Sequence, residues 1–169
     1  MKLPEGTQGV MVLLLGMLGP LAALAQTTWQ ENETQPPAAL NRSQLIPFDM
    51  SIRTELQFSV DASSVSVGSD RVVRYVLLAR SSGGTENILY EGLRCETAEA
   101  RNYDRWNQAE QRWVPSGASK PWRALSGVAA SLPAARLAYL AFCDGPTPTE
   151  PKERMLSDLR RGGKNVDQR

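Results

Sequence analysis

The chain has 169 residues, a length typical of one domain, and 19 lysine and arginine residues against 18 aspartate and glutamate residues, so its net charge is +1. This balance excludes a nucleic-acid-binding protein that depends on many uncompensated cationic contacts. Histidine is absent, which excludes Ser-His-Asp and Cys-His catalytic systems and zinc sites that need a histidine ligand.

The N-terminus has the pattern of an export signal. Residues 10–25 are almost wholly apolar, follow a positive charge at Lys2, and end in the small-residue pattern Ala-Leu-Ala at Ala25. A permanent membrane anchor is the alternative, but a spanning helix needs about 20 apolar residues, and glycine and proline interrupt this shorter run. We therefore predict a signal peptide over residues 1–25, cleavage near Ala25, and a periplasmic or secreted mature chain with no transmembrane anchor.

The two cysteines, Cys95 and Cys143, are predicted to form a disulfide. Export would place them in an oxidising compartment, where such bonds form and persist, and a single pair allows one connectivity. A redox-active pair is the alternative, although that chemistry favours the closely spaced Cys-x-x-Cys arrangement.

The middle of the chain predicts an antiparallel sheet. Apolar and polar residues alternate over 55–60, which places Leu56, Phe58 and Val60 on one buried face. Residues 71–80 have a continuous apolar centre typical of a strand covered on both sides, and two glycines follow as a hairpin turn. The expected strands are residues 55–60, 64–67, 71–80 and 86–95, with 101–106 and 111–114 as a second hairpin for which a helix is the alternative.

The C-terminal part predicts one helix and a polar tail. Pro133 suits a first helical turn, and Leu137, Leu140 and Ala141 share one face of a helix over residues 133–142. The fold class is therefore α+β, a mainly antiparallel β-sheet with a C-terminal helix packed on it. The expected divisions are a signal peptide over 1–25, a flexible leader over 26–47, the α+β domain over 48–145, and a disordered, charged tail over 146–169.

Four short motifs carry a family resemblance. They are Phe-Ser-Val-Asp at 58–61, Ser-Val-Ser-Val-Gly at 64–68, Asp-Arg-Val-Val-Arg-Tyr at 70–75 and Tyr-Glu-Gly-Leu-Arg-Cys at 90–95. With Trp113, Trp122 and the later Tyr139 and Cys143, they resemble the CNP1-like family of exported proteobacterial proteins over residues 48–143. The resemblance implies an exported, β-rich domain with two cysteines and no known catalytic residues, and residues 101–111 depart from the family's pattern.

The sequence predicts no catalytic, cofactor-binding or metal-binding residue. It contains neither glycine-rich nucleotide fingerprint and no Gly-x-Ser-x-Gly motif. The carboxylate pairs Asp61 with Asp70 and Glu91 with Asp104 are candidates for glycoside hydrolysis, which needs two carboxylates at a defined separation. Solvated turns are the simpler interpretation of these acids.

Arginine and aromatic residues interleave over residues 94–123, a combination common at interaction surfaces. In the alternative interpretation, the tryptophans pack into the sheet and the arginines cover them with their aliphatic stems. We predict an exported, non-catalytic binding or accessory module of the cell envelope, with an envelope protein or glycan as partner; an envelope hydrolase using a carboxylate pair is the alternative. The candidate interaction surface is Arg94, Arg105, Trp106, Arg112 and Trp113.

Overall fold

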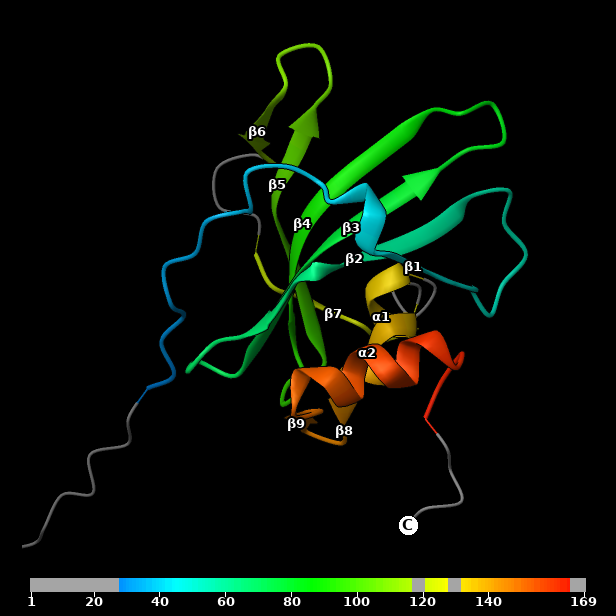
Figure 1. Ribbon diagram of the computed structural model, residues 1–169. Coiled ribbons are helices and arrows are strands. Elements are labelled where there is room, and N and C mark those ends of the chain that lie inside the picture. The colour runs from blue at the N-terminus through cyan, green and yellow to red at the C-terminus, as the bar shows by residue number, and fades with distance from the viewer. Residues whose placement is uncertain (1–27, 117–120, 128–131, 165–169) are drawn as a thin grey trace, which may run out of the picture.

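The computed structural model describes residues 28–116, 121–127 and 132–164. They form a seven-stranded antiparallel sheet with two α-helices on one side and a small two-stranded sheet (Figure 1). Six strands follow one another in chain order across the sheet, and the last strand, β7, pairs with β5. The strands are β1 (Leu45–Phe48), β2 (Gln57–Val67), β3 (Val72–Arg80), β4 (Glu86–Arg94), β5 (Glu99–Asn107), β6 (Arg112–Pro115) and β7 (Arg123–Ala124). The predicted fold class, mainly antiparallel sheet with a C-terminal helix, is confirmed.

Both predicted hairpins are present. Strands β3 and β4 pair from Val72 with Arg94 to Arg80 with Glu86, and the turn between them contains Gly84 at φ +84°. That backbone conformation favours glycine because it has no Cβ. Strands β5 and β6 also pair antiparallel, so the helical alternative for this region is wrong.

Strand β2 differs from the expected pair of short strands. Its 11 residues run through the predicted break, with a register shift between Asp61 and Ser66. The Ser64 hydroxyl accepts a hydrogen bond from Val76 N at 2.8 Å and donates to Asp61 O at 2.7 Å, so a side chain maintains the link across the bulge. Leu56 precedes the strand and is 43% exposed, so its predicted burial beside Phe58 and Val60 is wrong.

The first face of the sheet carries the larger core and the helices. The chain forms α1 (Pro133–Leu137), continues as a π-helical turn η3 (Ala138–Phe142), and returns through the short strands β8 (Cys143–Asp144) and β9 (Thr147–Pro148) to α2 (Lys152–Arg160). The predicted helix over 133–142 is thus present, with a π-helical second half. Tyr75 on β3 packs edge-on against Phe142, with ring centroids 5.1 Å apart. Figure 1 shows the helices together at the lower end of the sheet.

The predicted disulfide joins this helical layer to the sheet. Cys95 follows β4 and is bonded to Cys143 at the end of η3, with Cα atoms 5.5 Å apart. The bond therefore fixes η3 against the strand that supplies Leu93 to the core. In the described part of the chain, no helix is long and apolar enough to cross a membrane.

The expected charged tail over 146–169 differs from the structure at α2. Met155, Leu156 and Leu159 of this helix are buried in the first-face core. These three apolar residues lie close enough in helical spacing to form a narrow stripe. Glu153, Arg154 and Arg160 of the same helix are exposed, whereas Asp158 is buried beside the stripe. A composition average over the segment conceals that stripe.

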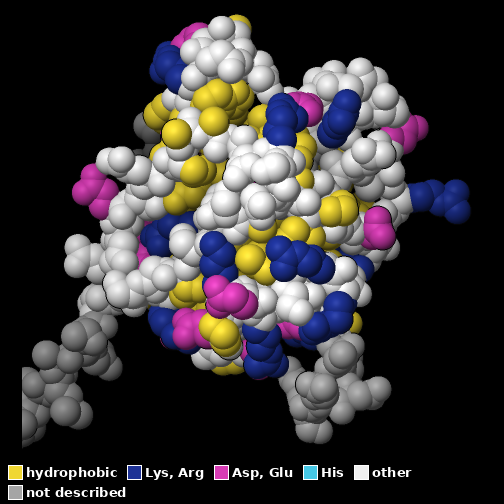
Figure 2. All heavy atoms as spheres, in the orientation of Figure 1, with side chains coloured by type: hydrophobic (Ala, Val, Ile, Leu, Met, Phe, Trp, Pro, Cys, Tyr) yellow, Lys and Arg dark blue, Asp and Glu magenta, His cyan; other side chains and the backbone are white. Residues whose placement is uncertain are grey.

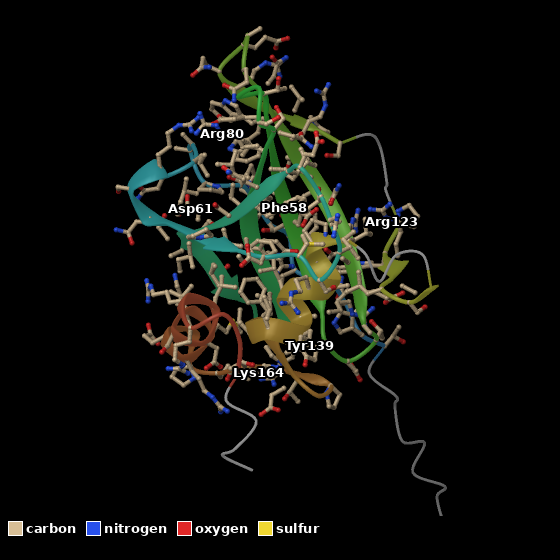
Figure 3. The ribbon with its side chains drawn as sticks, turned by 90° about the vertical axis from the view of Figure 1, so that its right-hand side faces the viewer. Phe58, Asp61, Arg80, Arg123, Tyr139 and Lys164 are labelled. Carbon is tan, nitrogen blue, oxygen red and sulfur yellow. A yellow bond between two sulfur atoms is a disulfide. The ribbon has the colours of Figure 1, made fainter. Side chains whose placement is uncertain are left out.

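The second face of the sheet is crossed by the N-terminal segment. Residues 28–41 pair with no strand in the described chain, and a 3-10 turn η1 (Arg42–Gln44) then leads into β1. Asn41 N donates to Asp61 Oδ2 at 2.7 Å, and Figure 3 shows Asp61 beside η1. The expected flexible leader over 26–47 thus differs from the structure over 28–47, where specific side-chain contacts and β1 pairing hold the chain.

Candidate functional site

Strand alternation places a row of aromatic and cationic side chains on the second face. Successive residues of a strand point to opposite sides, so residues two apart share a face. Tyr75, Leu77 and Leu93 lie in the first-face core, whereas Val76 and Tyr90 belong to a separate small cluster on the second face. Register and cluster membership together assign to the second face Arg74, Tyr90, Arg94, Arg101, Tyr103, Trp106 and Trp113.

Trp106 and Trp113 form an aromatic pair at the β5–β6 end of this face. They are direct cross-strand partners, with ring centroids 5.3 Å apart and ring planes at 76°. Both are half-buried, packed against the cluster that contains Tyr90. Hydrophobic side chains gather around this hairpin, with Lys and Arg among them (Figure 2). The tryptophans are thus packing residues that keep one side accessible.

The predicted interaction surface divides between the two faces. Arg94, Trp106 and Trp113 share the second face, but Arg94 lies opposite Glu99 at one end of β5, whereas the two tryptophans pair at its other end. Arg105 and Arg112 are exposed strand neighbours of the two tryptophans, so they point to the opposite side. Arg112 forms an ion pair with Glu110 in the adjoining turn.

Next to the aromatic pair, the N-terminal segment places a carboxylate among three donors. Glu31 accepts hydrogen bonds from Arg101 Nη1 at 2.7 Å, Tyr103 Oη at 2.6 Å and Trp122 Nε1 at 3.2 Å. Burial, together with the hydrogen bond to the Glu31 carboxylate, raises the pKa of Tyr103, so the phenol remains a donor across the ordinary pH range. We call Arg94, Arg101, Tyr103 and Trp122 the arm-docking site, because they hold the N-terminal segment, or arm, against the sheet.

The same site holds an aromatic ring. The Arg94 guanidinium lies 3.6 Å from the centroid of the Trp29 ring, and Trp122 contacts that ring edge-on at 6.1 Å. Trp29 Nε1 donates to Asp70 O at 2.9 Å. The stacked guanidinium, the aromatic edge and the carbonyl acceptor thus match the three parts of an indole: its π face, its edge and its N–H.

A buried ion pair between Asp70 and Arg74 adjoins this site. Asp70 accepts hydrogen bonds from Arg74 Nη1 at 3.0 Å and Nη2 at 2.6 Å, and their side chains are 0% and 5% exposed. Asn32 N also donates to Asp70 Oδ2 at 2.8 Å. Burial alone would raise the pKa of the carboxyl, but the hydrogen bonds from Arg74 and the backbone outweigh it and lower the pKa. Among the described polar atoms, Arg74 Nε and Arg101 Nε are buried without a hydrogen-bond partner.

The model of the CNP1-like family matches residues 24–160. The chain belongs to the CNP1-like family. The resemblance over residues 48–143 is thereby confirmed, and the family match also includes the docked N-terminal segment and α2. No curated protein and no solved structure matches the chain.

In this CNP1-like domain, the candidate carboxylate pairs do not converge. Glu91 lies on the first face, where it accepts a hydrogen bond from Tyr75 Oη at 2.9 Å. Asp104 is opposite Tyr90 in the register and so lies on the second face. Asp61 and Asp70 are each bonded to backbone N–H groups, Asp61 near η1 and Asp70 beneath Asn32. Within the described residues, no group of three or more acids or cysteines is placed to hold a metal ion.

Sequence reasoning missed the role of the N-terminal segment in this CNP1-like domain. Trp29 and Glu31 lie in a polar stretch with no hydrophobic periodicity, and their partners are 41 to 91 residues away. The only local signal is a tryptophan and a glutamate two residues apart in a stretch otherwise poor in apolar residues.

Gly92 gives the first test of this arrangement. A Cβ atom there would lie 2.8 Å from carbons of the Tyr103 ring, so Gly92→Ala must displace the ring that donates to Glu31. We expect it to lower the free energy of unfolding by about 1–3 kcal/mol, as overpacking does, and to make residues 28–40 more sensitive to proteases. Gly83→Ala is the control, because its Cβ meets nothing closer than 3.9 Å. Equal melting curves and digestion patterns for the two variants would contradict the packing described.

Glu91 gives a second test, through pH. Burial, only partly opposed by the Tyr75 hydrogen bond, raises its pKa from 4.5 to about 7. The folded state therefore keeps a proton that the unfolded state has lost, and stability falls as pH rises from about 4.5 to 7. Each unit of pKa corresponds to about 1.4 kcal/mol, so Glu91→Gln should be more stable than wild type by about 3 kcal/mol at pH 8 and nearly equal at pH 4. Urea unfolding at both pH values measures the difference, and a gap that does not change with pH would disprove it.

Proposed function

We propose that this CNP1-like protein is an exported, non-catalytic binding or accessory module of the cell envelope. The apolar run before Ala25 has the form of a cleavable signal, which supports delivery to the periplasm. The Cys95–Cys143 disulfide fits an oxidising compartment of that kind. The partner is an envelope protein or glycan.

The observation that carries the proposal is the aromatic pair on the second face. Trp106 and Trp113 keep part of their rings accessible at the β5–β6 end of the sheet. Tryptophan and arginine are enriched among residues that dominate binding energy, since they offer large, rigid contact areas and several donors. A carboxylate-pair hydrolase has less support, because Glu91 and Asp104 lie on opposite faces of the sheet.

Trp106→Ala tests this function. We expect the variant to lose about 1–3 kcal/mol of partner-binding free energy, the range for truncating an interface tryptophan. Trp113 is less suitable, because its Nε1 donates to Pro37 O at 2.6 Å and its removal would also disturb the N-terminal segment. The measurement is quantitative capture of envelope components by immobilised mature protein, followed by the affinity of each captured component.

Tyr139→Ala is the matched control. Tyr139 is an aromatic residue that is 73% exposed among the helices, at the other end of the molecule from the β5–β6 hairpin (Figures 1 and 3). A partner retained by wild type and the Tyr139 variant but lost by a cooperatively folded Trp106 variant supports the proposal. If the affinity of a partner depended on Tyr139 and not on Trp106, the binding surface would lie on the helices instead.

A further inference from the structure

We propose that the arm-docking site is a peptide-binding site and that Trp29–Glu31 is its built-in occupant. Its partner ligand is an extended segment of another envelope protein, in which an aromatic residue is followed two positions later by a carboxylate. This inference rests on the proposed function, since it names the chemistry recognised by one part of the same face. Three features of the docked segment carry it: its side-chain contacts, its backbone contacts and the absence of strand pairing.

The side-chain contacts define a two-point pattern. The indole of Trp29 contacts both the Arg94 guanidinium, 3.6 Å from its centroid, and the Trp122 ring, which itself lies 5.7 Å from that guanidinium. Two residues later, Glu31 receives one hydrogen bond each from Arg101, Tyr103 and Trp122. Trp122 takes part in both contacts, so the spacing between ring and carboxylate is set by the site itself. A shorter acid or a different spacing would lose the shared contact.

The backbone contacts are independent of side-chain identity. Asn32 N donates to Asp70 Oδ2 at 2.8 Å, and Asn32 O accepts from Arg74 Nη2 at 3.3 Å. Any residue other than proline would offer the same two groups at this position. The buried Asp70–Arg74 pair thus recognises an extended main chain, while the arm-docking site recognises the two side chains before it. In the described structure, Arg74 Nε and Arg101 Nε are buried without a hydrogen-bond partner.

The segment is held in a way that permits exchange. Strand β1 is fixed by four register pairs with β2, whereas residues 28–41 pair with no strand among the residues that the structure describes. The contacts of Trp29–Glu31 with the domain are side-chain contacts of the kind a separate peptide can reproduce. A tethered segment competes at an effective concentration in the millimolar range, so a partner peptide must displace it. Weakening the docked segment should therefore expose the site.

The test uses the full mature chain carrying Trp29→Ala and Glu31→Ala, together with a fluorescent peptide of residues 28–34. We expect the peptide to bind this variant saturably and at least tenfold more tightly than it binds wild type, in which the tethered segment competes. Adding Arg101→Gln to the variant should weaken binding about tenfold. Arg112→Gln, an exposed arginine on the opposite face, is the matched control and should leave binding unchanged. Fluorescence anisotropy measures each affinity, and melting curves confirm folding.

Several results would overturn the proposal. The first is a variant that melts cooperatively but shows no saturable binding of the peptide. The second is equal binding of a control peptide that lacks the tryptophan and the glutamate. Concentration-dependent dimerisation of wild type that the variant loses would assign the site to a second copy of the chain instead. If the double variant does not fold, Glu31→Gln alone replaces it and should show the same order of affinities. If the peptide does not bind but capture of a partner still depends on Trp106, the proposed function holds and only this ligand is wrong.

Discussion

Asp70→Ala should lower the free energy of unfolding by about 3–5 kcal/mol, because it leaves the buried Arg74 charge without its partner. The two side chains are 0% and 5% exposed, and Arg74 donates two hydrogen bonds to the carboxylate. Asp70 also accepts from Val72 N at 3.3 Å, so its loss removes a contact at the start of β3. Urea unfolding at pH 7 measures the change.

The pH dependence of this pair has a defined sign. The pKa of Asp70 is lowered from its ordinary 3.8 in the folded protein, so the pair contributes stability that is fully present above about pH 4. That contribution is lost as pH falls through the lower, folded-state pKa. The Asp70→Ala variant should therefore approach wild-type stability only in strong acid.

An exposed ion pair provides the control for Asp70. Arg112 and Glu110 are paired with side chains 61% and 48% exposed, where solvent screens the charges. Glu110→Ala should change stability by less than about 1 kcal/mol. If Asp70→Ala cost no more than this control, the buried pair would not be the support for the arm-docking site that its geometry indicates.

Removing the disulfide should have an effect of similar size. Cys95 and Cys143 are 48 residues apart, and closing a loop of that length contributes about 4 kcal/mol in the chain-entropy description. Replacing both with serine should lower the free energy of unfolding by about this amount. The helical layer should be destabilised first, because the bond joins η3 to the end of β4.

Reductant gives the internal control for the disulfide. Dithiothreitol should shift the urea midpoint of wild type toward that of the double-serine variant and leave the variant itself unchanged. A wild-type midpoint that does not respond to reductant, with both thiols shown to be free, would contradict the stabilising role of the bond.

The central sheet was predictable because its signals are local. Residues 71–80 and 86–94 combine apolar runs with a glycine turn, and a hairpin needs little more than these. The two cysteines allowed one pairing, and the structure has it. The break predicted within β2 was absent, because the Ser64 hydroxyl substitutes for a backbone partner at the bulge.

The candidate site was harder to predict, for two physical reasons. The pairing of Arg105 with Val114 and of Trp106 with Trp113 sends adjacent residues to opposite faces, so a cluster that is compact in sequence divides in space. The docking of Trp29 depends on Arg94 and Trp122, which are distant in the chain and follow no periodic pattern. Contacts of that kind become visible only in the folded structure.

The most direct test of the second face as a binding surface is photo-crosslinking in the native envelope. A benzophenone amino acid would replace Trp106 in one variant and Tyr139 in another, the first on the second face and the second among the helices. We expect light-dependent adducts with a discrete partner from position 106 and none from position 139. Adducts from position 139 alone, with both variants folded and exported, would contradict a binding role for the second face.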